Sequence, residues 1–135
     1  MRYMLLIYTQ QEPATPEEME QVKQAHWEVI EETTRKGILQ GCEPLAPTHT
    51  ATTVRVSDGK MLTTDGPFAE TKEQLAGYYI LDCKNVEEAI SYAARIPSAC
   101  GGKSGCIEVR ELPGLPSREA VSEQAEQKSD AVLAQ

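Results

Sequence analysis

The chain has 135 residues, of which 40% are hydrophobic and only 5% aromatic, so we expect one domain with a mainly aliphatic core. Its 21 acidic and 13 basic residues give a net charge of −8, which disfavours binding to nucleic acids and to anionic membrane surfaces. No apolar run is long enough to cross a bilayer, and the short apolar start lacks a signal-peptide cleavage site, so we expect a cytoplasmic protein.

The first part of the chain predicts a strand, a helix and a second strand. Residues 2–9 are apolar on both faces, which is typical of a strand in a buried sheet. Thr15 and Pro16 form a helix-start signal and Gly37 is typical of a helix end, so we expect a helix between them. Residues 38–45 predict the next strand. The helix carries one apolar stripe, which consists of Met19, Val22, His26, Val29 and Thr33.

A hairpin and a tight turn occupy the middle of the chain. Residues 51–56 alternate in polarity, Asp58 and Gly59 form a hairpin-turn signal, and residues 61–64 return as the partner strand. The run of residues 65–73, Asp-Gly-Pro-Phe-Ala-Glu-Thr-Lys-Glu, follows directly. Its glycine and proline force a turn, which holds an acidic side chain at the end of a strand.

The second part of the chain predicts a strand, a helix and a final strand. Residues 77–83 form an apolar strand, and the next helix starts near Asn85 and ends before Pro97. We expect residues 98–104 to form a glycine-containing loop and residues 105–112 to form the last strand.

The order of these elements predicts the fold class. Without the hairpin of residues 51–64 the order is β-α-β-β-α-β, which is typical of an α+β fold of the ferredoxin-like class. This fold leaves one face of its sheet uncovered, and that face is apolar here, so we expect a homodimer. We divide the chain into a domain of residues 1–113 and a polar tail of residues 114–135, which we expect to be disordered or weakly helical.

The sequence predicts no metal site and no cofactor. The two histidines, His26 and His49, lie far apart in the chain, and no clustered ligand set accompanies them. No glycine motif has the spacing of a phosphate-binding loop. The four cysteines include no closely spaced pair, so we expect reduced thiols rather than a zinc or redox motif.

His26 and Asp65 are the candidate catalytic residues. A histidine on an apolar helix face can act as a general base if a carboxylate orients it, and the turn can place Asp65 over the sheet near the first helix. The alternatives are structural roles. His26 would then bond a backbone carbonyl or a threonine at the edge of the core, and Asp65 would accept hydrogen bonds from the backbone of its own turn.

Arg55, Lys72 and Tyr78 are the candidate ligand-binding residues, and they suit an anionic or phenolic ligand. The alternative for the two basic residues is a solvated ion pair with Glu70 or Glu73. Because side chains alternate along a strand, either Tyr78 or the tyrosine that follows it must pack in the core or in an interface.

Several segments, in the same order, resemble one protein family. The run of residues 65–73 resembles the signature of the DGPF-type proteins, a branch of the YCII-related (YciI-like) family, and the match extends to about Leu112. The resemblance implies a dimeric α+β barrel, a fold in which two sheets pack face to face. The other matching segments are residues 2–8, 51–55, 77–81, 93–97 and 107–110.

The resemblance also implies where a site lies. In YciI-like members the proposed catalytic pair is a His on the first helix and an Asp near the end of that helix. His26 matches the His, but about Arg35 stands at the position of the Asp. Asp65 is therefore the replacement partner.

Two functions follow, and the sequence does not decide whether the chain is an enzyme. Most members of the family have no established activity. The first function is a homodimeric module that binds or senses a small molecule in a pocket between sheet and helix, near the DGPF turn. The second is a cofactor-independent isomerase or lyase acting on a small ring compound, with His26 as general base and Asp65 as its partner. The departure at Arg35 favours the first function.

Overall fold

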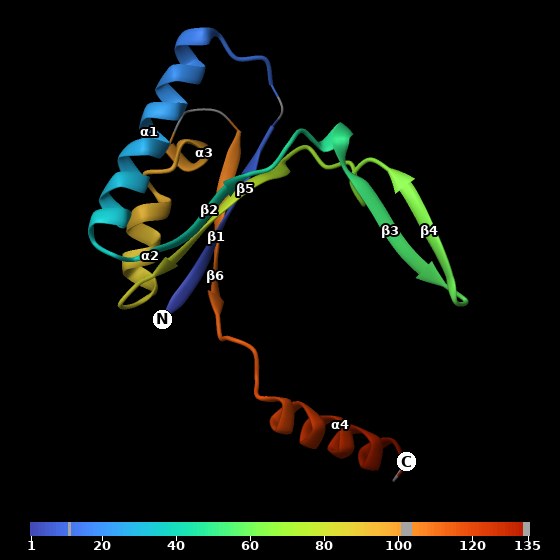
Figure 1. The fold of residues 1–135 in the computed structure, drawn as a ribbon. Coiled ribbons are helices and arrows are strands. Elements are labelled where there is room, and N and C mark those ends of the chain that lie inside the picture. Colours follow the sequence, from blue (N-terminus) through green and yellow to red (C-terminus); the bar gives the residue numbers. More distant parts are fainter. Residues whose placement is uncertain (11, 101–103, 134–135) are drawn as a thin grey trace.

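A computed structural model describes residues 1–10, 12–100 and 104–133 of the chain (Figure 1). A short 3₁₀ helix, η1, precedes the hairpin. The elements are β1 (Arg2–Thr9), α1 (Pro16–Arg35), β2 (Leu39–Pro44), η1 (Thr48–Thr50), β3 (Thr52–Ser57), β4 (Lys60–Asp65), β5 (Gln74–Asp82), α2 (Val86–Ala93), α3 (Pro97–Cys100), β6 (Gly105–Leu112) and α4 (Arg118–Leu133).

The main sheet has four strands in the order β2-β5-β1-β6, and every neighbouring pair is antiparallel. With the hairpin, the short helices η1 and α3 and the terminal helix α4 set aside, the element order is β-α-β-β-α-β, so the predicted α+β fold of the ferredoxin-like class is confirmed. Helices α1, α2 and α3 lie on one side of this sheet (Figure 1).

The core forms where these helices meet the sheet. Alternate residues of β1 point to the helices: Leu5 is fully buried, whereas Met4 and Leu6 on the other face are only half-buried. Strand β5 follows the same pattern, and Leu81 is fully buried. The core cluster consists of Tyr3, Leu5, Ile7, Val29, Tyr79, Leu81, Cys83, Ala89, Tyr92, Ala93 and Ile96.

The sequence signals at the ends of α1 and α2 have the expected structural roles. The Thr15 hydroxyl accepts a hydrogen bond from the backbone N–H of Glu18 at 3.1 Å, and the Asn85 side chain accepts one from Glu88 at 3.0 Å. Gly37 follows α1 with φ +74°, a conformation that favours glycine. The side chains of Thr15 and Asn85 each supply an acceptor for a backbone N–H group that the first turn of the helix leaves unpaired.

The opposite face of the main sheet has no helix over it within the described part of the chain (Figure 1). We call this surface the open face. It carries apolar and aromatic side chains that are half-buried by their neighbours alone, namely Met4, Leu6, Tyr8, Tyr78 and Ile80.

Strands β3 and β4 form a separate two-stranded sheet that pairs with no other described strand. Its turn uses Asp58 and Gly59, both with positive φ, as the sequence predicted. The hairpin projects away from the main sheet on the side opposite α1 (Figure 1).

Two expectations about local structure need correction. The predicted loop at residues 98–104 begins inside a short helix, α3, which a proline starts. The predicted inner stripe of α1 is buried only in its second half: Val29 is 1% exposed, but Met19 is 63% and Val22 is 44% exposed. The first turns of α1 extend past the end of the sheet, which leaves these side chains uncovered (Figure 1).

The polar tail forms a helix, α4, that stands apart from the sheet and its helices (Figure 1). None of the helices in the described ranges is long and apolar enough to cross a membrane.

Replacing Leu81 by alanine tests the assignment of the core. Because Leu81 is fully buried, we expect Leu81→Ala to lower the free energy of unfolding by about 2–5 kcal/mol. Ile90→Ala is the matched control, because this side chain is 51% exposed on α2 and its loss should change stability by less than about 0.5 kcal/mol. Urea unfolding at one fixed protein concentration measures both. Equal losses would contradict the assignment.

Candidate functional site

The turn that follows β4 forms one wall of a hollow with a volume of about 550 Å³. The short helix η1 forms the facing wall. We call it the turn hollow, and its lining residues are Thr48, His49, Asp65, Gly66, Pro67, Glu70, Thr71, Lys72 and Gln74.

Backbone geometry fixes this turn to the base of the hairpin. Gly66 has φ +99°, a conformation that disfavours any residue with a side chain. Its N–H donates to the carbonyl of Ala51 at 2.7 Å, and its own carbonyl accepts from the Thr53 hydroxyl at 2.8 Å. Gln74 donates to the carbonyl of Thr71 at 2.7 Å at the other end of the turn. The wall of the turn hollow is therefore ordered before any ligand arrives.

The lining of the turn hollow carries charges of both signs. Asp65 and Glu70 contribute carboxylates, and Lys72 contributes an ammonium group. Across the described residues Lys72 makes no ion pair, and the carboxylate of Asp65 accepts no hydrogen bond. Neither the expected surface ion pair of Lys72 nor the expected capping role of Asp65 is therefore observed. These groups are available to a polar ligand.

His26 has a separate environment, between α1 and the main sheet. Its Nδ1 atom lies 2.6 Å from the hydroxyl oxygen of Tyr79 on β5, and the two rings are nearly parallel with centroids 5.9 Å apart. Tyr79 is 1% exposed and lies opposite Cys42, its register partner on β2. One buried phenol thus connects a helix residue to the edge strand.

The protonation of this group follows from burial. Burial lowers the pKa of His26 from 6.5 and raises the pKa of Tyr79, so both side chains are neutral near pH 7. A separation of 2.6 Å is short for an N–H donor and typical of an O–H donor, so we expect the phenol to donate to Nδ1. In that tautomer the Nε2 atom of His26 carries the proton of the ring and is itself a hydrogen-bond donor.

The structure separates the residues that the sequence grouped into one pocket. Asp65 and Lys72 come together in the turn hollow. Arg55 lies on β3 opposite a residue of β4, away from this lining. Tyr78 lies on the open face, because side chains alternate along β5 and Tyr79 points to the helices.

The observed partner of His26 is Tyr79 rather than Asp65, a carbonyl or a threonine. Sequence reasoning treated Tyr79 only as packing. The available signal was the alternation of β5, which places Tyr79 on the same side of the sheet as the inner stripe of α1. His49 also lines the turn hollow, and no sequence pattern pointed to it.

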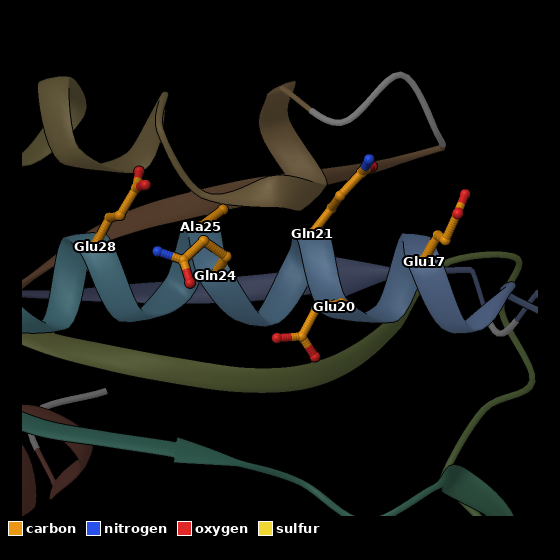
Figure 2. Close-up of a pocket in the computed structure, with 6 residues that line it drawn as sticks. All are labelled: Glu17, Glu20, Gln21, Gln24, Ala25 and Glu28. Carbon is orange, nitrogen blue, oxygen red and sulfur yellow. The ribbon is translucent and has the colours of Figure 1, made fainter.

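A second hollow, of about 650 Å³, lies along α1 (Figure 2). All six residues that line it belong to that one helix, and three of them are glutamates. In Figure 2 the side chain of Glu20 points away from that of Glu28, so the carboxylates do not converge on one point. This is a solvated helix surface rather than a binding site. Among the described residues, no group of three or more His, Cys, Asp or Glu side chains is arranged to hold a metal ion.

Comparisons with known proteins identify relatives. The family model of the YCII-related domain matches residues 1–113. An uncharacterized protein of Rhizobium meliloti (strain 1021) is 47% identical in a 78-residue alignment that covers 54% of this chain and 62% of that protein. The chain therefore spans less than two thirds of the length of this curated relative.

One solved structure is also similar. It is a 5-chloro-2-hydroxyhydroquinone dehydrochlorinase from Burkholderia phenoliruptrix AC1100, in complex with 2,5-dihydroxybenzoquinone. The sequence identity is 17% and the TM-score 0.46, and the match covers 83% of this chain and 95% of the other.

Replacing Tyr79 by phenylalanine tests the proton arrangement at His26. In the wild type we expect His26 to titrate below 6.5 and to carry its proton on Nε2. Tyr79→Phe removes the donor to Nδ1, so the tautomer with the proton on Nδ1 should become populated. Nitrogen-15 NMR of the ring measures both properties. Tyr78→Phe, one residue away on the other face, should leave them unchanged, and a wild-type ring protonated on Nδ1 would contradict the assignment.

Proposed function

Because the chain belongs to the YCII-related domain family, we propose that it is a homodimeric module that binds or senses a small molecule near its DGPF turn. We assign this role to a domain of residues 1–113 and treat residues 114–135 as a separate tail. A cytoplasmic location is part of the proposal and agrees with the free thiols of Cys42, Cys83 and Cys106. Because the chain has a net charge of −8, we propose neither nucleic acid nor an anionic membrane surface as a partner.

The turn hollow is the observation that carries the binding proposal. It combines an ordered wall with an ammonium group and carboxylates that have no partner of their own in the described chain. Its volume of about 550 Å³ is large enough for a small molecule, and the hollow is open to solvent. The ligand that fits is small and polar, with an anionic or hydroxyl group for Lys72 and a hydrogen-bond donor for Asp65.

The open face supports the homodimer. A sheet packed on one face only exposes the apolar side chains of its other face, and Leu6 and Ile80 lie there without cover. The charges of this face are partly neutralised, since Arg110 and Glu108 form an ion pair at 2.6 Å. Glu43, opposite Tyr78 on β2, is a further exposed charge at the edge of this face. Two copies related by a two-fold axis can pack the apolar side chains of their open faces together.

An isomerase or lyase acting on a small ring compound is the second candidate, and the contact between His26 and Tyr79 favours it. In this candidate enzyme, His26 is the general base and Tyr79, rather than Asp65, is the residue that orients it. To accept a proton at Nε2, the imidazole must carry its own proton on Nδ1 and donate a hydrogen bond from it to the phenol oxygen of Tyr79. The observed distance favours the other tautomer, so binding remains the first proposal.

Native mass spectrometry of the purified chain tests the binding proposal. We expect a dimer that retains a reproducible extra mass. Lys72→Ala should reduce the retained fraction about tenfold or more, because it removes a charge-assisted contact. Lys60→Ala is the matched control, because it removes an equal charge from the exposed hairpin outside the turn hollow. Equal retention by both variants, or no retained mass, would contradict a ligand site at this turn.

Proton exchange tests the enzymatic candidate. A base at His26 should exchange carbon-bound protons of hydroxyquinones or cyclic enones in D₂O, followed by proton NMR. His26→Ala should slow the exchange about 100-fold or more, and Tyr78→Phe should not change it. Exchange that survives His26→Ala would exclude this mechanism for the compounds tested.

A further inference from the structure

The β3–β4 hairpin lacks the cover that a two-stranded sheet needs. It pairs with no other described strand, and both strands are exposed along almost their whole length. An isolated hairpin is marginally stable in water and gains stability when it packs on another surface. Nothing in the described part of this chain supplies that surface except at the base, where Ala51 and Thr53 bond to Gly66.

One face of the hairpin is apolar toward its tip, whereas Thr52, Thr63 and Asp65 lie on the same face nearer the base. Val54 and Val56 point to the same side of β3, and Met61 lies directly opposite Val56 on β4. Their exposures are 57%, 71% and 70%, so three neighbouring apolar side chains are open to solvent. We call these three residues the apolar hairpin face.

The other face of the hairpin is polar. Its pairs include Arg55 opposite Leu62 and Ser57 opposite Lys60, with Leu62 as the one large apolar side chain. A hairpin with one apolar and one polar face is patterned for burial on one side. The apolar hairpin face is therefore the side that a partner would cover.

The position and charge of the hairpin favour a second copy of this chain as that partner. The hairpin projects to the side of the main sheet opposite α1, which is the side of the open face (Figure 1). A copy packed on the open face would lie within reach of the hairpin. The hairpin carries two basic residues, Arg55 and Lys60, and two acidic residues, Asp58 and Asp65, so its net charge is zero. The chain as a whole has a net charge of −8, but the hairpin adds no charge repulsion between two copies.

We infer that the β3–β4 hairpin is a dimerisation arm that packs its apolar face on the second copy. The inference rests on the proposed homodimer and adds to it a contact outside the open face. Because a two-fold interface contains every contact twice, each copy would both give and receive one arm. The base of each arm also carries Asp65, so dimerisation would hold the wall of the turn hollow in place.

Photo-crosslinking of the full chain tests the arm. Met61→para-benzoylphenylalanine places the probe on the apolar hairpin face, and Leu62→para-benzoylphenylalanine places it on the polar face one residue away. After irradiation we expect a covalent dimer in denaturing gels from the first variant and several-fold less from the second. Peptide mapping should locate the crosslink on a second copy of this chain. Equal yields, or crosslinks only within one chain, would overturn the arm.

Dimer affinity distinguishes failure of the arm from failure of the homodimer. We expect Val56→Asp to weaken the dimer at least tenfold by light scattering over a dilution series, and Ser57→Asp, which adds the same charge to the polar face, to leave it unchanged. If Leu6→Asp on the open face dissociates the dimer but Val56→Asp does not, the arm is wrong and the homodimer stands. A wild-type chain that is monomeric at all concentrations would overturn both.

Discussion

The structure depends on a sheet that is packed on one face only. Leu5 and Leu81 are fully buried because α1, α2 and α3 cover their side of the sheet. The residues that alternate with them, such as Leu6 and Ile80, are apolar but have no cover within the described chain. Alternation along a strand makes both facts consequences of one pattern, since every residue placed in the core puts its neighbours on the open face.

Strand β5 connects the core, the open face and both candidate sites. Tyr79 points to the helices and fixes Nδ1 of His26, while Tyr78 points to the open face. The turn hollow lies directly before this strand, and Gln74 belongs to both. A ligand in the turn hollow would therefore contact the segment that leads into the sheet, and through it the proposed dimer surface. In a sensor, this segment would transmit ligand binding from the turn hollow to the proposed dimer surface.

The sequence was sufficient for the fold but only partly for the site. Periodicity, Thr15, Asn85 and Gly37 located α1 and α2 but not the short helix α3, because caps and alternation are local properties. The expected pairing of His26 with Asp65 required knowledge of which loop lies over which face, and that depends on strand order. Strand order also keeps Asp65, in the lining of the turn hollow, apart from Tyr79, which is buried beside His26. Met19 and Val22 fit the inner stripe by spacing, yet the length of the sheet decides that they stay exposed.

Sedimentation equilibrium of the full chain over a wide concentration range is the most direct test of the central claim, that a second copy covers the open face. The account predicts a particle of twice the 14.9 kDa chain mass that persists on dilution to the micromolar range. A particle of 14.9 kDa at every concentration would contradict it, because the apolar side chains of the open face would then be exposed in the stable form of the protein.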